Sequence, residues 1–481
     1  MTGPLSRTFH PDEANQAFTT GRLLETGRYE YNPRDHHGPT LYYAAAPLQR
    51  AFGHADCATL DGDLLRATPL VFAVLTLVFA ALACKRLVGK ALLPILPLAT
   101  LPCLFFYATD FIQETLLGCF LAAAFFFGVR YAQSTVSPGR LKPGSWAVFL
   151  GVSLGLAAAT KETCVLSFAA AAVALVPCLR GFARPRNLSQ HVVLCAVAAA
   201  VTALAFYSDF GRDFSGVRSL LEMPLAYWRR AAGSAEASVG ACWHVHPWHW
   251  YFSRCFTHGN GGAAALGAAF VLLAAIRFAQ SRIPPAATFV SVYAVVLLAA
   301  YSAIPYKTPW CMLTVLEAMA LACGLLAFAG KRGGETDARA TRVCALLLAI
   351  VSAEQVLDCS AIARDPDSDK ITWNYAHASP QARELAEAAD EVLRKNGDGF
   401  LAVALPPENV WPFPWYNRAN EKRTGYWTSF EDLEDLAAKG VKPTAVIVPA
   451  TEGHLVQPLF PHLTHTRRFE TRPRVRVRLF W

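Results

Sequence analysis

The stretch ATPLVFAVLTLVFAALAC, residues 67–84, carries no charge. A helix needs about 20 predominantly apolar residues to cross the hydrocarbon core of a bilayer, so this stretch predicts a transmembrane span. Further runs of the same kind, with at most one charge each, lie at 190–208, 262–276, 285–305 and 308–330. Of the 481 residues, 54% are hydrophobic and 17% charged, whereas soluble domains have about 25% charged residues. The sequence therefore predicts an α-helical protein that crosses a membrane many times.

Two longer apolar runs are interrupted by charges, and each is expected to form a helical hairpin. Residues 91–129 are interrupted by Asp110 and Glu114, and residues 146–179 by a Lys–Glu pair. Both runs exceed the length of one span. With these two interruptions, we expect spans at 64–84, 91–109, 111–129, 146–160, 162–179, 190–208, 262–280, 284–304, 309–329 and 341–361.

The basic residues determine which loops face the cytoplasm. Every second loop is basic, and these loops contain Lys85/Arg86/Lys90, Arg130/Arg140/Lys142, Arg180/Arg184/Arg186, Arg277/Arg282 and Lys331/Arg332/Arg339/Arg342. The positive-inside rule places these loops in the cytoplasm. The remaining loops, including residues 1–63 and 209–261, then face outward from a plasma or inner membrane. The net charge of +8 is spread over short loops, which argues against a nucleic-acid partner.

The tail has the composition of a soluble domain. Ser379 and Pro380 predict the start of a helix that continues to Gly397, and residues 399–405 and 444–449 predict strands. A helix over 428–440 has a potential capping box, formed by a serine and an aspartate three residues apart. We therefore divide the chain into an outer loop (1–63), a membrane domain (64–362) and an extracytoplasmic α/β domain (363–481).

Asp12 and Glu13 are the first candidate site residues. After Pro11, two acids are typical of the first turn of a helix, where they interact favourably with the helix dipole. Alternatively, they line an outward-facing site, because the segment continues through His37 and Tyr42 towards the first span. Both interpretations remain open from the residues alone.

Further candidates lie at the outer ends of the expected spans. Glu114 and Lys161 are either solvated or ion-paired residues at hairpin tips, or part of a site, because ionisable groups at membrane depth usually mark function. Lys307, in AIPYKTPWCM (303–312), is the only charged residue between Arg282 and Glu317. It either snorkels to the interface or binds a phosphate at the headgroup level, with Trp310 nearby.

Two aromatic motifs are less specific. CWHVHPWHWYF (242–252) contains His244, His246 and His249, which form either a metal site or part of an interfacial aromatic belt. WPFPWYNR (411–418) is compatible with packing between domains, membrane contact or stacking on a sugar. The 13 cysteines show no zinc-binding spacing.

Residues 11–43, PDEANQAFTTGRLLETGRYEYNPRDHHGPTLYY, resemble the first outer loop of the GT-C membrane glycosyltransferases, especially the protein O-mannosyltransferase-like group. Within that superfamily, five motifs resemble the "flippase-activity-associated" family of archaeal and bacterial glycosylation. These motifs are HHGP (36–39), ATKET (159–163), PYKTPW (305–310), NYAHASPQARELA (374–386) and WPFPWYNR. The resemblance implies a GT-C-like fold with about ten transmembrane helices and a small α/β domain.

The resemblance also implies a reaction. A sugar linked to polyprenyl phosphate is transferred, with inversion, to a glycan, lipid or protein acceptor on the extracytoplasmic face. Asp12 is implied as the general base and Glu13 as its neighbour in the acidic pair. The expected substrate-binding residues are Glu114, Lys161, Lys307, His37, Tyr42 and Trp310. A divalent metal ion is a candidate cofactor, with Asp12 and Glu114 as candidate ligands.

The sequence departs from the family pattern in two places. Asp110 stands where relatives tend to have arginine, and Thr115 where they have an acid. Met1 lies only 11 residues before Asp12, so we expect the superfamily's first span to be absent, through a mis-assigned start or degeneration.

The alternative function is a non-catalytic accessory of lipid-linked sugar translocation. An enzyme should bring Asp12, Glu13, Glu114 and Lys307 together on one cavity. Scattered groups would favour the accessory.

Overall fold

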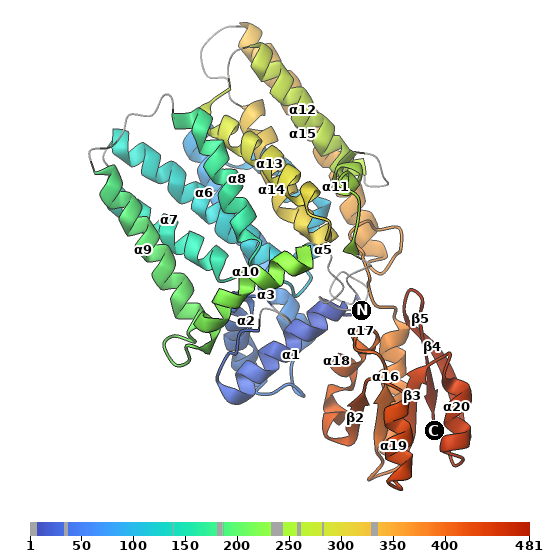
Figure 1. Ribbon diagram of the computed structural model, residues 1–481. Helices are drawn as coiled ribbons and strands as arrows, with labels where there is room; N and C mark the ends of the chain where they lie inside the picture. Colours follow the sequence, from blue (N-terminus) through green and yellow to red (C-terminus); the bar gives the residue numbers. More distant parts are fainter. Residues whose placement is uncertain are drawn as a thin grey trace.

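A computed structural model describes residues 7–32, 37–137, 139–179, 185, 187–231, 244–256, 261–280, 283–328 and 335–481. A bundle of long helices forms one part of the molecule, and a small sheet domain lies at one end of this bundle (Figure 1). Two helices of the first outer loop, α1 (Pro11–Thr26) and α2 (Thr40–Ala51), lie between these two parts.

The helices of the bundle follow the predicted spans. They are α3 (Gly62–Val88), α4 (Leu92–Ala99), α5 (Pro102–Tyr107), α6 (Glu114–Val136), α7 (Pro143–Ala158), α8 (Cys164–Cys178), α9 (Leu188–Tyr207), α12 (Gly261–Ala279), α13 (Pro285–Ala303), α14 (Met312–Ala327) and α15 (Glu335–Arg364). Among the described residues, six helical segments are long and apolar enough to cross a membrane, and α7, α8 and α12 are shorter apolar helices. The protein is therefore a multi-pass membrane protein, as predicted.

Residues 91–109, which were predicted to form one span, do not form one continuous helix. They consist of α4 and α5, and the chain between these two helices is extended at Leu101. Pro102 causes this break, because a proline disfavours the helical conformation of the residue before it. The hairpin formed by α4, α5 and α6 is nevertheless present, and Asp110 lies at its tip as expected.

Close helix packing in the bundle depends on small residues. A Cβ atom added at Gly151 of α7 would lie 2.2 Å from the Cys195 carbonyl oxygen, and one added at Gly155 would lie 2.4 Å from that of Ala199. Both carbonyls belong to α9, so the two glycines allow the backbones of α7 and α9 to touch. Helix α14 occupies the centre of the bundle, and all of its residues are buried.

The sheet domain contains α16 (Gln381–Lys395), β1 (Leu401–Ala404), α17 (Pro407–Val410), α18 (Phe413–Asn417), β2 (Thr424–Trp427), α19 (Glu431–Ala438), β3 (Ala445–Pro449), α20 (Gly453–Leu459), β4 (Thr466–Arg472) and β5 (Val475–Phe480). The strand order is β2-β1-β3-β5-β4. Strands β1, β2 and β3 are parallel, and β5 is antiparallel to both of its neighbours. The predicted α/β character is confirmed, as are two predicted strands and the reciprocal hydrogen bonds between Ser429 and Asp432.

The WPFPWYNR segment packs against the first outer loop. Trp415 stacks on Phe9 with the ring centroids 4.5 Å apart, and the Phe9 N–H donates a hydrogen bond of 2.7 Å to the Tyr416 hydroxyl. Arg418 donates to the Leu60 carbonyl at 2.9 Å. Of the three interpretations of this motif, packing between domains is the correct one. The sheet domain thereby holds the start of α1 in place.

Candidate functional site

Helix α1 begins at a capping box built around His10. The His10 Nδ1 atom accepts a hydrogen bond from the Asp12 N–H at 3.1 Å, and the His10 N–H donates to Glu13 Oε2 at 3.0 Å. Pro11 occupies the first helical position, where its missing N–H costs nothing. Both acids therefore lie in the first turn of α1, as one of the two interpretations predicted. Because they are adjacent in the helix, their side chains point in different directions.

Glu13 points inward and is completely buried. Arg66 of α3 donates two hydrogen bonds to its carboxylate, at 2.9 and 2.8 Å, and the Phe111 N–H donates a third at 2.9 Å. Burial opposes ionisation of Glu13, but Arg66 and Arg7 outweigh it and lower the pKa to about 2. We call Glu13, Arg66 and the N–H groups of His10 and Phe111 the Glu13 network. It joins α1 to α3 and to the tip of the α5–α6 hairpin.

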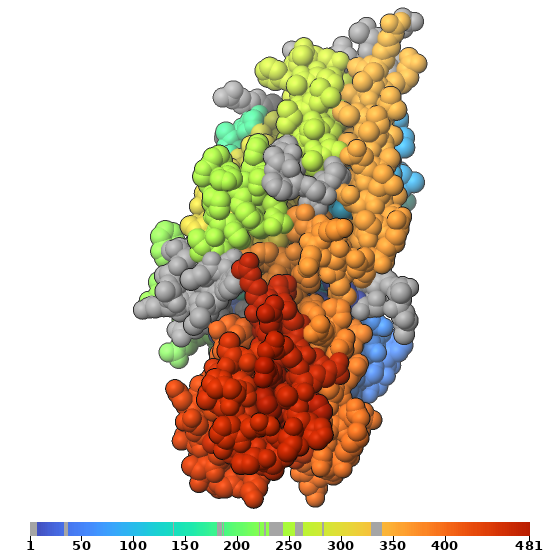
Figure 2. All heavy atoms as spheres, turned by 90° about the vertical axis from the view of Figure 1, so that its right-hand side faces the viewer, coloured from blue at the N-terminus to red at the C-terminus, as the bar shows by residue number. Residues whose placement is uncertain are grey.

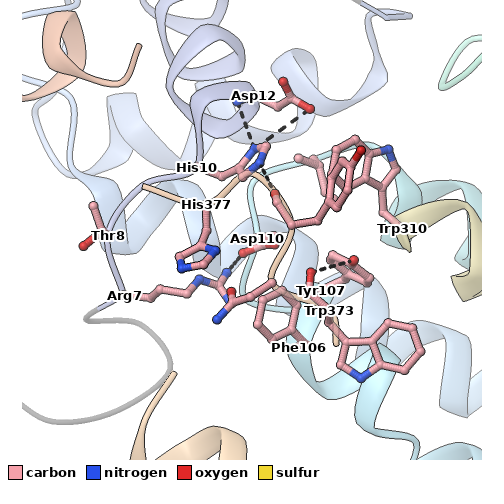
Figure 3. Close-up of a pocket in the computed structure, with 13 residues that line it drawn as sticks. Arg7, Thr8, His10, Asp12, Phe106, Tyr107, Asp110, Trp310, Trp373 and His377 are labelled. Atoms are coloured by element: carbon pink, nitrogen blue, oxygen red, sulfur yellow. Dashed lines mark hydrogen bonds and ion pairs between the residues drawn. The ribbon is translucent and has the colours of Figure 1, made fainter. Parts of the chain in front are cut away.

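Asp12 lies at one edge of a pocket, beside His10 (Figure 3). The pocket is lined by Arg7, Thr8, His10, Asp12, Phe106, Tyr107, Asp110, Ile112, Trp310, Trp373, Asn374, Tyr375 and His377. The Asp12 side chain is 51% exposed, and its Oδ2 atom lies 3.9 Å from His10 Nδ1. No described residue donates a hydrogen bond to its carboxylate. The free space is about 20 Å³, enough for about one water molecule.

An ion pair occupies one side of this pocket. Arg7 pairs with Asp110, and its guanidinium lies over the Phe106 ring, 4.1 Å from the centroid. Burial lowers the pKa of Arg7 to about 10, although Glu13 acts in the opposite direction. Position 110 is an aspartate in this chain, and Arg7 provides an arginine beside it.

Tyr375 connects the pocket to the loop between α10 (Ser215–Ala231) and α12. Its carbonyl oxygen lies 2.9 Å from His10 Nε2. Its hydroxyl lies 3.1 Å from His244 Nδ1 and 3.2 Å from His246 Nε2. These two histidines therefore face a tyrosine, and among the described residues no group of three or more metal-ligating side chains exists.

Two cations, Lys307 and Arg254, lie close to His246 and so next to Tyr375. The buried Lys307 ammonium contacts the Ile304 carbonyl, and Arg254 donates to the Thr372 carbonyl at 2.8 Å. In the described part of the chain, neither cation has a carboxylate within 4 Å. Burial lowers the pKa of both cations. Burial lowers the pKa of His246 as well, and both cations lower it further. Two desolvated positive charges without a counter-ion are suited to an anionic ligand.

Four predicted site residues lie behind the pocket and do not line it. Lys161 pairs with Glu114, and both side chains are buried. Glu162 accepts a hydrogen bond from Tyr31 at 2.6 Å, and its other oxygen lies 2.8 Å from His37 Nδ1. Tyr42 donates to Gln16. Ion pairing is thus the correct interpretation of Lys161. Glu114 is paired with Lys161 and does not line the pocket with Asp12.

The expected convergence on one cavity is only partial. Asp12 and Trp310 line the pocket, whereas Glu13, Glu114 and Lys307 do not. Lys307 remains coupled to the pocket, because its N–H donates to the His244 carbonyl at 2.8 Å and His244 contacts Tyr375.

Comparison with solved structures identifies the fold. ArnT from Cupriavidus metallidurans bound to undecaprenyl phosphate has a TM-score of 0.68 at 13% identity, over 98% of this chain and 94% of ArnT. The apo form of ArnT has a TM-score of 0.65 over the same shares of the two chains. The Archaeoglobus fulgidus oligosaccharyltransferase in complex with zinc and sulfate has a TM-score of 0.55 at 13% identity, over 94% of this chain and 66% of that chain. The chain has the GT-C fold.

Comparison of the amino-acid sequence with protein families and curated proteins found no match. The GT-C assignment therefore rests on the three-dimensional structure, and the narrower resemblance to the flippase-activity-associated family stays a prediction.

Within the GT-C fold, several pocket residues were missed by sequence reasoning. They are Arg7, His10, Trp373, Tyr375 and His377. The NYAHASP motif contains two of them and was a usable signal, because it places a tyrosine and a histidine just after the last span. Arg7 had no such signal, because its partner Asp110 is distant in the sequence.

Proposed function

We propose that this chain is an integral-membrane glycosyltransferase that takes a sugar from a polyprenyl-phosphate donor and transfers it with inversion on the extracytoplasmic face. The observation that carries the proposal is a half-exposed carboxylate at the pocket, Asp12, that accepts no hydrogen bond from a described residue, together with the cations Lys307 and Arg254, which have no carboxylate within 4 Å in the described part of the chain. Similarity of fold to ArnT, which was solved with undecaprenyl phosphate, supports a lipid-phosphate donor.

The proposed reaction is a single displacement. Asp12 accepts the proton of the acceptor hydroxyl as the hydroxyl oxygen attacks the anomeric carbon. The bond from that carbon to the phosphate oxygen breaks, and the polyprenyl phosphate leaves with the electron pair. Lys307 and Arg254 stabilise the negative charge on the leaving phosphate. Trp310 and Tyr375, which line the pocket, provide apolar surfaces for the sugar ring.

Asp12 is preferred over its acidic neighbours because of their partners. All hydrogen-bonding directions of Glu13 are used within the Glu13 network, and Asp110 is paired with Arg7. Among the described acids that line the pocket, Asp12 is the one whose carboxylate is half exposed and accepts no hydrogen bond, and its charged neighbours are His10 at 3.9 Å and Arg472. We therefore assign Glu13 a positioning role, since it fixes the helix turn that carries Asp12.

A second candidate function is a non-catalytic accessory that binds lipid-linked sugar. Two observations favour it: the pocket has room for about one water molecule, and Glu114 and Lys161 neutralise each other outside the pocket. A transferase requires this pocket to widen so that the sugar reaches Asp12. An accessory that binds the lipid outside the pocket does not require this change.

The deciding experiment is the Asp12→Asn variant. Asparagine keeps the size of the side chain but does not accept the hydroxyl proton, so transfer should slow by a factor of about 10²–10⁴. Transfer is measured with the purified full chain and polyprenyl-phosphate sugars. The matched control is Asp63→Asn, which alters another exposed first-turn acid, in α3, and should leave the rate unchanged. Full activity of Asp12→Asn would remove Asp12 as the base. Donor binding without transfer by the wild type would favour the accessory.

The orientation is tested by cysteine labelling in intact cells. Arg140 and Asp398 are both exposed, and the loop charges place Arg140 in the cytoplasm and Asp398 outside. A membrane-impermeant maleimide should label Asp398→Cys above the background of the unaltered chain, and should not label Arg140→Cys until the cells are opened. The reverse pattern would place the site on the wrong side for the proposed donor.

A further inference from the structure

The hairpin of β4 and β5 is strongly basic. Residues 466–480 contain one acid, Glu470, and the arginines Arg467, Arg468, Arg472, Arg474, Arg476 and Arg478. Within the domain, Arg467 pairs with Glu384 at 3.1 Å and Arg476 with Glu470 at 3.0 Å. The other arginines have no carboxylate within 4 Å among the described residues. The hairpin therefore retains an excess of positive charge.

The arrangement of these arginines is unfavourable for the fold by itself. Arg468 and Arg478 lie directly opposite each other in the antiparallel ladder, where like charges destabilise a sheet. At the tip, Arg474 follows Pro473 and has a φ angle of +69°. This left-handed conformation favours glycine or asparagine in a turn. The Arg474 N–H donates a hydrogen bond to Glu470 Oε1 at 3.2 Å, and its side chain is exposed, so the guanidinium is accessible to a ligand.

The tip of the hairpin lies on the membrane side of the sheet domain. Figure 1 shows the turn between β4 and β5 at the edge of the domain that faces the helical bundle, and Figure 2 shows dark red atoms of these strands projecting towards the helices. Arg472, at the base of the turn, is close enough to Asp12 for the two charges to interact: burial lowers its pKa, and Asp12 opposes this shift. Asp12 itself lies at the outer ends of the spans, so the tip is near the level of the lipid headgroups.

We propose that the β4–β5 tip binds the phosphate groups of anionic membrane lipids and so holds the sheet domain against the membrane surface. Arginine suits this role because its planar guanidinium donates two parallel hydrogen bonds to one phosphate. Basic segments next to a membrane gain affinity from the negative surface potential of anionic lipids. This proposal does not depend on transferase activity.

The test compares the full chain in nanodiscs of phosphatidylcholine alone and with added phosphatidylglycerol. The readout is amide hydrogen exchange of residues 466–480. In the wild type, anionic lipid should slow exchange at the tip, and high salt should reverse this protection. The test variant is Arg474→Asn, and asparagine suits the left-handed position, so the hairpin should still fold. Because each arginine contributes roughly a fivefold gain near an anionic surface, the variant should lose most of the protection.

The matched control is Lys439→Gln/Lys442→Gln, which removes two exposed charges elsewhere in the same domain. This control should retain the lipid-dependent protection. Equal exchange in the two kinds of nanodisc for the wild type would overturn the proposal. Protection that is unchanged in the arginine variant would also overturn it, and would point to a contact with protein.

Discussion

The two carboxylates at the start of α1 are adjacent in sequence but lie in opposite environments. Glu13 is buried, and all of its hydrogen-bonding capacity is used by Arg66 and two backbone N–H groups. Asp12 is half exposed, and no described residue donates a hydrogen bond to its side chain. The first turn of α1 thus carries both a charge that stabilises structure and a charge that is available for chemistry.

The same contrast separates two lysines that lie in turns between helices of the bundle. Lys161 is buried and paired with Glu114. Lys307 is buried as well, but its ammonium contacts a backbone carbonyl and lies 5.9 Å from the centre of the Tyr251 ring, with no carboxylate within 4 Å among the described residues. A buried charge is stable only when it is paired or well hydrogen-bonded. The buried Lys307 and the half-exposed Asp12 are therefore the charges expected to meet a substrate.

The largest expected effect is that of Glu13→Gln. This change leaves the Arg66 guanidinium buried without its counter-charge, and breaking such a pair costs about 3–5 kcal/mol of the free energy of unfolding. Denaturant titration of the detergent-solubilised chain measures this loss. Asp12→Asn is the adjacent control and should change stability by less than about 0.5 kcal/mol. Similar losses in the two variants would remove the distinction between the two carboxylates.

The pH dependence of stability sharpens the same comparison. The pKa of Glu13 is about 2, compared with an ordinary value of 4.5. A lowered pKa stabilises the folded state fully above pH 4.5, and this contribution disappears as the pH falls through about 2. The shift corresponds to about 3 kcal/mol. The stability of the wild type should therefore fall more steeply than that of Glu13→Gln between these pH values. Parallel curves would show that Glu13 does not titrate as the structure predicts.

A small effect on stability, but a large one on lipid binding, is expected for Lys307→Met. Methionine replaces an unpaired buried ammonium with an apolar side chain of similar length, so the free energy of unfolding should change by less than about 1 kcal/mol. Binding of undecaprenyl phosphate should weaken roughly tenfold or more, because a charge-assisted hydrogen bond is lost. Lys90→Met, in an exposed position, is the control and should bind normally. Unchanged lipid binding by Lys307→Met would show that Lys307 does not bind the lipid phosphate.

Much of the fold could be predicted because it depends on local patterns. Apolar runs and their charged interruptions defined the helices, and strands β1 and β3 appeared as short apolar runs. Strands β2, β4 and β5 were missed, although VRVRLF (475–480) alternates apolar and charged residues as a half-buried strand does. The break between α4 and α5 was also missed, although Pro102 signalled it.

The site was predicted only in part because its contacts are distant in sequence. The motif containing Asp12 was visible, and Trp310 was found from PYKTPW. The partners that give each charge its role were not visible, because 53 residues separate Glu13 from Arg66 and 131 separate His244 from Tyr375. Sequence spacing identified charged groups, but it did not show which of them neutralise each other.

The docking of Trp415 and Tyr416 on Phe9 has a consequence for biosynthesis. The Phe9–Tyr416 hydrogen bond joins residues 407 positions apart. At about 5–20 residues per second, a ribosome needs roughly 20 to 80 s to make the chain between them. The outer loop with Asp12 is thus synthesised among the first residues but receives its supporting partner only after the last span has been made. We expect the pocket to mature last, so a chain that stalls before the sheet domain emerges would occupy the membrane without a finished site.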